Sequence, residues 1–320
     1  MVKASLTPPG LEISADTGPG TGLDTAADAM SNVPQQTIGK VAIASGIGLH
    51  LAQQTTVRLI PVEPNAGRYF VRTDLPGDII PIPATAAQVV QTQLSTELGT
   101  KSAADSSTQP TVRTVEHLLA ALVALEIDNV RIEIDGPEVP LLDGSAKEWM
   151  AAITPAGIQQ QSVPREVPSP LTTPITVHAE DAWVAAFPSP TLRFTYGIDF
   201  ELAAIGNQWH SWTPTPGDFS GSFAAEIATA RTFGLAHQID YLRSKGLIQG
   251  GSLDNALVCS HEGWVNPPLR FDNEPARHKM LDLIGDLGLV GSLPVAHYAA
   301  YKASHTLHVK LAKQLVERFS

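Results

Sequence analysis

The chain carries a histidine and two aspartates at intervals of four residues, at His278, Asp282 and Asp286. If this segment is helical, the three side chains lie along one stripe, because residues four apart share a helix face. Imidazole and carboxylate groups one turn apart can bind the same divalent metal, as the two histidines of HExxH helices do. The other side of the run is apolar and suited to packing. The alternative is a surface helix whose charged groups are solvated, and the run alone leaves both interpretations open.

The composition limits the classes of protein that fit this chain. It has 320 residues, 43% of them hydrophobic and 17% charged, which suffices for a sizeable core and favours two domains over one. A net charge of −11 argues against a nucleic-acid surface. The single cysteine, Cys259, excludes an intrachain disulfide and a thiolate zinc cluster, and it suits a reducing cytosol. No apolar stretch approaches the roughly 20 residues that cross a bilayer.

Composition shifts along the chain predict where its domains begin and end. The first 36 residues are rich in Gly, Pro, Thr and Ala and lack hydrophobic periodicity, so we expect residues 1–36 to form a flexible extension rather than a signal or transit peptide. Prolines and polar residues gather again at 159–173, which we predict to be a linker. The patterned segments predict two α+β domains, at 37–158 and 174–320.

Strand and helix patterns follow one another in the first half. Residues 37–43 and 56–61 are strand-like and flank a turn with two glycines; we prefer a hairpin to a phosphate loop, because GxG without a following helix is a weak signal. Thr114 is placed to cap a helix that runs from His117 into leucines and alanines. Strict alternation of apolar and polar residues then predicts a strand at 127–134.

The second half repeats this plan. Its patterns predict strands within 175–200 and at 296–303, and helices near 223–230, 239–246, 275–289 and 308–319. Each half thus has strands and a helix that starts at a histidine and runs into leucines, at His117 and at His278. This similarity suggests a duplicated module.

Six motifs in order along the chain resemble one enzyme family. They lie at residues 114–118, 138–145, 231–234, 250–252, 277–287 and 301–305. Together they are similar to the UDP-3-O-acyl-N-acetylglucosamine deacetylases, over roughly residues 36–318. These zinc amidases catalyse the committed step of lipid A synthesis. The resemblance implies two similar α+β domains, each a sheet packed on helices, in a layered β-α-α-β sandwich with a small insert in each domain.

The resemblance also implies a metal centre and a general base. By motif position, His117, His278 and Asp282 hold Zn²⁺ and leave an open position for water, as catalytic zinc requires. Fe²⁺ also suits such ligands. Glu116 is the general base that takes the proton of the water. Thr232 donates a hydrogen bond to the oxyanion that develops on the acetyl carbonyl.

The resemblance implies a second group of residues, which provide positive charge and a proton for the reaction. Lys279 matches a family residue near the same centre and adds positive charge there. His305 is the cationic partner that protonates the leaving amine. Asp286 orients His305 and raises its pKa through an opposite charge. Without the motif, a loop histidine paired with any nearby acid was an equal alternative for His305.

Substrate contacts follow from the same resemblance. It places Phe233 and Lys279 near the sugar, Phe200 near the uracil and Lys302 near the diphosphate. An inserted βαβ unit at about 235–258 would form the tunnel for the acyl chain. Its expected apolar lining is Ile239, Leu247, Ile248 and Val258, for which ordinary core packing is the alternative.

The chain departs from the family pattern at a few positions. Gln238 stands where many relatives have an acid that contacts the sugar, and Ser304 replaces the usual glycine before His305. Residues 307–309 replace a more polar run. His50 matches a family position beside the centre. We expect structural or surface roles for six histidines: His50, His178, His210, His237, His261 and His297. Glu133, Glu138 and Asp143 are expected to be solvated or capping rather than ligating.

The implied activity is a zinc-dependent hydrolysis that removes the N-acetyl group from UDP-3-O-acyl-N-acetylglucosamine and releases acetate. The alternatives are a non-catalytic relative that binds a nucleotide sugar or a partner, and a zinc amidase that acts on another N-acyl sugar. Retention of the three ligands, the base, the acid and its orienting aspartate favours the enzyme. We expect a cytoplasmic monomer with a small-molecule substrate, no nucleic-acid partner and no transmembrane segment.

Overall fold

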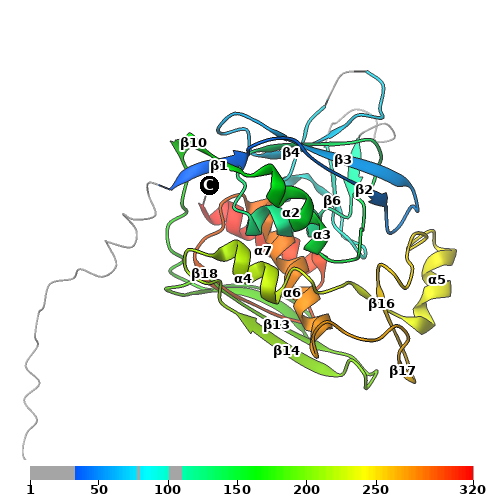
Figure 1. Ribbon diagram of the computed structural model, residues 1–320. Coiled ribbons are helices and arrows are strands. Elements are labelled where there is room, and N and C mark those ends of the chain that lie inside the picture. The colour runs from blue at the N-terminus through cyan, green and yellow to red at the C-terminus, as the bar shows by residue number, and fades with distance from the viewer. Residues whose placement is uncertain (1–32, 78–79, 101–109, 320) are drawn as a thin grey trace, which may run out of the picture.

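The computed structural model describes residues 33–77, 80–100 and 110–319, and it contains two five-stranded sheets with helices between them (Figure 1). The first sheet has the order β2 (Ala42–Ile47), β3 (Gln54–Pro61), β9 (Val130–Ile134), β4 (Arg68–Arg72) and β5 (Ile82–Pro83). The second has the order β11 (Ile175–Ala179), β12 (Ala182–Pro188), β18 (Ala296–Tyr301), β13 (Arg193–Asp199) and β14 (Asn207–Trp212). The expected layered α+β sandwich is confirmed.

The two sheets share one topology. In each, the strand that comes last in the chain lies between the second and the third, and it pairs parallel with the third (β9 with β4, and β18 with β13). The other neighbours in both sheets are antiparallel. The β2–β3 pair confirms the predicted hairpin, but its first strand runs from Ala42 to Ile47 instead of 37–43. The repeated strand order supports the duplicated module that the sequence suggested.

Apolar and polar side chains alternate along the strands, so that one face of each sheet packs on the helical layer. In β9, the apolar side chains of Val130, Ile132 and Ile134 are buried. The intervening Arg131 and Glu133 point to the other face, where they form an ion pair of 2.7 Å. This period of two is what the sequence predicted for the segment.

The helices form the middle layer and one of the inserts (Figure 1). In chain order they are α2 (Glu116–Ala124), α3 (Lys147–Ile153), α4 (Phe219–Glu226), α5 (Ile239–Ser244), α6 (Glu274–Leu287) and α7 (His305–Phe319). Nearly every residue of α2 and α6 is buried, as expected for helices covered on all sides. None of the helices in the described ranges has both the length and the apolarity needed to span a membrane.

Two small three-stranded sheets stand apart from the main sheets. The first consists of β6 (Val89–Gln91), β7 (Glu97–Gly99) and β8 (Thr111–Arg113). The second consists of β15 (Phe233–Leu235), β16 (Leu257–Ser260) and β17 (Gly263–Trp264). Because β15 and β16 are parallel and α5 lies between them in the chain, this second insert is the βαβ unit that the resemblance implied.

The boundaries predicted for the extension and the linker were wrong, because each segment contains residues of a strand. Strand β1 (Pro34–Ile38) starts inside the predicted extension, and β10 (Ile158–Pro164) occupies the start of the predicted linker. The two strands pair antiparallel across more than 100 residues of sequence. Local composition cannot reveal such pairing, because the partner that stabilises each segment is distant in the chain. The rest of the predicted extension, residues 1–32, lies outside the described residues.

Several helix ends also differ from the predictions. Thr114 does not cap α2: its φ is +58°, Val115 is the capping residue, and the Thr114 hydroxyl donates to Glu138 instead. Helix α4 begins four residues earlier than predicted, because the Asp218 carboxylate accepts the Gly221 N–H. Helix α7 begins three residues early, at His305, which puts this histidine in a helix rather than a loop.

A close crossing of α2 and α6 sets the geometry of the central layer. A Cβ added at Gly285 of α6 would lie 2.0 Å from the backbone oxygen of Glu116 in α2. One added at Gly288 would lie 2.9 Å from a methyl group of Val123. Only glycine therefore lets the two helix backbones come this close, and the contact at Gly285 falls next to His117.

We predict that Gly285→Ala destabilises the protein. In an unhindered helix interior the same change stabilises by about 0.5–1 kcal/mol. Here the new methyl group must push α2 away, so we expect a loss of about 3 kcal/mol in the free energy of unfolding. Urea unfolding measures it, with Gly234→Ala as the matched control, because a Cβ there meets no atom within 4 Å. An unchanged or raised stability in Gly285→Ala would contradict the close crossing.

Candidate metal centre and active site

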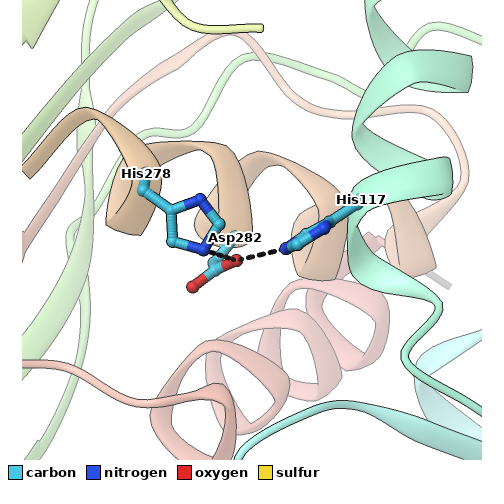
Figure 2. A group of neighbouring side chains, drawn as sticks. All are labelled: His117, His278 and Asp282. Carbon is cyan, nitrogen blue, oxygen red and sulfur yellow. Dashed lines mark ion pairs between the residues drawn. The ribbon is translucent and has the colours of Figure 1, made fainter. Parts of the chain in front are cut away.

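Two helices bring three metal-binding side chains to one point. His278 and Asp282 lie one turn apart on α6, and His117 faces them from the first turn of α2 (Figure 2). The Asp282 Oδ1 atom lies 3.4 Å from His278 Nε2 and 3.5 Å from His117 Nε2. One potential ligand atom from each residue lies within 4.8 Å of the others, and all three residues are buried. The three residues that the sequence predicted as ligands are therefore together.

The protonation of His278 leaves a lone pair facing a carboxylate. Its Nδ1 lies 3.1 Å from the backbone oxygen of Ala230, which can only accept, so Nδ1 carries the proton. Burial lowers the pKa of His278 to about 4, so the ring is neutral at pH 7 and Nε2 has no proton. Burial raises the pKa of Asp282, but Lys279 and His278 outweigh it and hold that pKa well below its usual range. The unprotonated Nε2 of His278 and the carboxylate Oδ1 of Asp282 therefore face each other at 3.4 Å.

This arrangement fits a bound cation. Zinc ligands lie about 2.0–2.2 Å from the ion, which places neighbouring atoms of a tetrahedral site roughly 3.3–3.6 Å apart. The His–Asp separations of 3.4 and 3.5 Å match that spacing. The Lys279 ammonium group donates to the other oxygen, Oδ2, at 2.7 Å and leaves Oδ1 to the ion. Three protein ligands would leave a position for water and substrate.

Glu116 lies beside the centre on the first turn of α2. Its side chain is only 3% exposed, and its Oε2 accepts the backbone N–H of Thr96 at 3.0 Å. Its Oε1 faces His305 Nε2 at 3.9 Å, too far for a direct hydrogen bond. Burial raises the pKa of Glu116, more than the nearby histidines lower it. A carboxylate with one oxygen fixed and the other near a cationic ring suits a general base.

His305 and Asp286 form a buried pair near Glu116 and Asp282. His305 Nδ1 lies 2.8 Å from Asp286 Oδ2, which leaves Nε2 directed towards Glu116 and Asp282, at 3.9 and 4.0 Å. Burial lowers the pKa of His305, but Asp286 and Glu116 outweigh it and raise the pKa to about 9. The imidazole is therefore cationic at neutral pH and has a proton to give.

Two further residues contact Asp286 that the sequence analysis did not assign to the site. The Thr96 hydroxyl donates to Oδ1 at 2.5 Å, and His308 Nδ1 lies 2.9 Å from Oδ2. A signal for His308 existed, since it is three residues after His305 and shares its helix face. Thr96 could not have been found, because it comes from the first insert region, 190 residues from Asp286.

A buried ion pair holds the segment that carries Thr232. Glu274, the first residue of α6, is fully buried and accepts the backbone and side-chain N–H groups of Arg231 at 2.9–3.2 Å. The Thr232 N–H donates to the Gly144 oxygen at 2.7 Å. Gly144 has a φ of +81°, and a Cβ there would lie 2.0 Å from the Asn255 oxygen, so it must stay glycine. Contacts from both halves of the chain therefore fix this segment.

The predicted substrate residues fall into three groups. Phe233 lies next to the centre, with its ring 6.5 Å from that of His278, and Phe200 packs on Phe233 edge to face at 5.5 Å. Lys302 is exposed and forms an ion pair with Asp181 away from the cluster. In the second insert Leu247 is buried, and three predicted lining residues are half-buried: Ile239, Ile248 and Val258.

Glu138 is neither solvated nor a helix cap, which corrects the prediction. It is fully buried, and its carboxylate accepts the backbone N–H groups of His50 and Leu51 and the Thr114 hydroxyl at 2.8–3.0 Å. The same loop contacts the second insert, because His50 Nδ1 accepts the N–H of Ile248 at 3.3 Å. Glu138 therefore braces a loop that links the first domain to the insert.

The sequence is similar to one family of known proteins over most of its length. The profile of the family described as LpxC, UDP-3-O-acyl N-acetylglycosamine deacetylase, matches residues 35–317. A UDP-3-O-acyl-N-acetylglucosamine deacetylase from Nostoc sp. is 56% identical over 283 residues, 88% of this chain and 98% of the relative. One from Synechocystis sp. is 52% identical over 88% of this chain and 99% of its own length. A relative from Arabidopsis thaliana, named as mitochondrial, is 45% identical over 88% of this chain and 87% of its own.

We predict that Glu274→Gln destabilises the protein in a pH-dependent way. Burial raises the pKa of Glu274, but hydrogen bonds from Arg231 and Arg270 outweigh it, so the folded pKa lies below the ordinary 4.5. The carboxylate therefore stabilises the fold fully above about pH 4.5, and this contribution disappears as the pH falls through the folded pKa. We expect a deficit of about 3 kcal/mol at pH 7 that narrows below pH 4.5.

Urea unfolding at several pH values measures this deficit. The matched control is Glu133→Gln, whose ion pairs with Arg58 and Arg131 lie on the outer sheet face and should contribute about 1 kcal/mol or less. A Glu274→Gln deficit that stays constant from pH 7 to pH 3 would show that the charge of Glu274 does not stabilise the fold.

Proposed function

Because the chain belongs to the UDP-3-O-acyl N-acetylglycosamine deacetylase family, we propose that it hydrolyses the N-acetyl group of UDP-3-O-acyl-N-acetylglucosamine and releases acetate. The observation that carries the proposal is the convergence of His117, His278 and Asp282 beside Glu116 and His305. The reaction is a step of lipid A synthesis, which assigns the protein to lipopolysaccharide and lipid metabolism.

His117, His278 and Asp282 would hold one divalent ion. We propose Zn²⁺, with Fe²⁺ as the alternative, because two imidazoles and a carboxylate suit both ions. When bound, the ion would lower the pKa of a water molecule towards 7 and polarise the acetyl carbonyl. The fixed proton on His278 Nδ1 supports this assignment, because it keeps the Nε2 lone pair available.

The proton transfers fall to two side chains, Glu116 and His305, whose facing atoms lie 3.9 Å apart. Glu116 takes the proton of the attacking water with the oxygen that does not bind Thr96. His305 gives the proton on Nε2 to the sugar nitrogen, so that the C–N bond breaks to yield acetate and a free amine. Asp286 keeps His305 cationic and oriented. Each such transfer typically contributes about 10²–10⁴-fold in rate.

Polar side chains near the carbonyl stabilise the charge that develops during attack. Thr232 donates a hydrogen bond to the developing oxyanion, and Lys279 adds positive charge beside Asp282. The fixed backbone around Thr232 supports its role, because a preorganised donor needs no reorganisation when the charge appears.

The rest of the substrate would lie along the residues around the centre. Phe233 contacts the sugar and Phe200 stacks on the uracil. Lys302 binds the diphosphate by exchanging its partner Asp181, which is feasible because exposed ion pairs are weak. The acyl chain enters the second insert between the apolar side chains Ile239, Leu247, Ile248 and Val258.

We propose further that the protein works as a cytoplasmic monomer. All residues of the site come from one chain, so the chemistry requires no second subunit. The single cysteine, Cys259, is buried and free, which is in keeping with a reducing compartment.

Acetate release from UDP-3-O-acyl-N-acetylglucosamine tests the function and its metal dependence. We expect the protein dialysed against a chelator to lose its activity, and added Zn²⁺ or Fe²⁺ to restore it. Substrates of varied acyl-chain length separate this activity from that of an amidase with another N-acyl sugar. Full activity after chelation would rule out metal catalysis, and no release by metal-loaded protein would rule out the deacetylase.

We predict that Glu116→Ala and His278→Ala fail for different reasons. Glu116→Ala should keep its zinc but lose about 10³-fold in kcat, because the general base is gone. His278→Ala should lose metal affinity, because one of three ligands is missing. Zinc content by mass spectrometry and acetate release measure both effects, with the exposed Glu148→Ala as control. If Glu116→Ala turns over at the parent rate, Glu116 is not the base.

A further inference from the structure

Asp286 holds two imidazoles rather than one. His305 Nδ1 and His308 Nδ1 both lie near the same oxygen, Oδ2, at 2.8 and 2.9 Å. The other oxygen accepts the Thr96 hydroxyl at 2.5 Å. Asp286 and His308 are completely buried, so no solvent takes the place of any of these partners. The carboxylate is thus fixed from three sides, and His308 is the imidazole among its partners that has no assigned role.

The second nitrogen of His308 connects Asp286 to the sheet. His308 Nε2 lies 2.9 Å from the hydroxyl oxygen of Tyr196, a fully buried residue of β13. The same hydroxyl lies 2.7 Å from the backbone oxygen of Ala303, two residues before His305, and its single proton is shared between this oxygen and His308 Nε2, because the ring proton of His308 is on Nδ1. A continuous hydrogen-bonded path therefore runs from β13 through Tyr196 and His308 to Asp286. The same phenol also fixes the backbone that leads into α7.

The group of Asp286, His305 and His308 also has the spacing of a metal site. Its contacts argue against an ion there. Distances of 2.8–2.9 Å from nitrogen to oxygen are those of N–H donors to a carboxylate, so protons occupy the space between these atoms. The His–Asp separations at the proposed zinc site are 3.4 and 3.5 Å, without a proton between His278 and Asp282. The second group is therefore a hydrogen-bonded network.

We propose that His308 is a positioning residue for the acid His305. It donates its Nδ1–H to Asp286 and so keeps Oδ2 turned towards the His305 ring. The inference rests on the proposed deacetylase function, because His305 acts as the acid only in that reaction. His308 itself is one turn further along α7 and acts through Asp286, while His305 Nε2 faces Glu116.

Removal of His308 frees the carboxylate to rotate. Thr96 holds only Oδ1, so without the second imidazole the position of Oδ2 depends on His305 alone. The ring of His305 then samples orientations in which Nε2 no longer faces the reacting nitrogen. Loss of such outer hydrogen-bond partners typically costs 10- to 100-fold in activity. The effect should fall on kcat, since the network has no contact with the predicted substrate side chains Phe200 and Phe233 among the described residues.

Two substitutions at His308 test the proposal. His308→Leu has no donor for Asp286, and we expect kcat to fall about 10- to 100-fold with KM and zinc content unchanged. His308→Asn keeps an amide N–H near the place of Nδ1, and we expect its kcat within about 3-fold of the parent. A purely structural role would instead lower the unfolding temperature of both variants with no rescue by Asn. Parent-like kcat in His308→Leu would overturn the proposal.

A double-mutant cycle tests whether His308 affects kcat through His305. In a His305→Gln background, where the acid is already absent, His308→Leu should cost less than about 2-fold in addition. A further loss of 10-fold or more there would show that His308 acts elsewhere and would overturn the proposal. If His308→Leu does not fold, Tyr196→Phe replaces it in the test. This substitution removes one oxygen atom from the hydrogen-bonded path, and we expect it to lower kcat by about 3- to 10-fold. Parent-like kcat in Tyr196→Phe would contradict the path through β13.

The same experiments separate this inference from the proposed function. An active parent enzyme with a fully active His308→Leu variant refutes only the role of His308. A parent that releases no acetate when loaded with zinc refutes the deacetylase function, and the role of His308 with it.

Discussion

The close approach of α2 and α6 is the constraint on which the site depends. Gly285 lets the ligand helix pass so near to the backbone of Glu116 that any side chain would collide with its carbonyl oxygen. Glu116 and His117 stand at the start of α2, and His278 and Asp282 stand on α6. A wider spacing of the two helices would separate His117 from Asp282, because among the elements described in the structure only α2 places His117 near Asp282. The two sheets hold this crossing in place from both sides (Figure 1).

Each buried charge near the centre has a partner that offsets its desolvation. Asp282 has Lys279, Glu274 has Arg231, and Asp286 has His305. Although the chain as a whole is acidic, basic side chains therefore lie next to the buried acids near the centre. The exception is the gap between Asp282 and the neutral ring of His278, where two acceptors meet without a proton. Such a contact is unfavourable unless a cation lies there, which is why the gap indicates a metal.

Local patterns predicted much of this arrangement. The four-residue spacing of His278, Asp282 and Asp286 gave their shared helix face, and alternation gave strand β9. Partners distant in sequence could not be read from local patterns. The pairing of β1 with β10 joins segments that compositional analysis assigned to an extension and a linker. Glu138 was expected to be solvated or capping. Its partners in the loop at His50 are 87–88 residues away, so no local pattern shows them.

Zinc K-edge X-ray absorption of the metal-loaded protein shows directly whether His117, His278 and Asp282 bind one ion, since it reports the ligands without any assay. We predict only nitrogen and oxygen neighbours at about 2.0–2.2 Å, with the scattering signature of two imidazoles, one of which disappears in His117→Ala. A sulfur neighbour at about 2.3 Å, or the same two imidazoles in His117→Ala, would show that α2 and α6 do not share the ion.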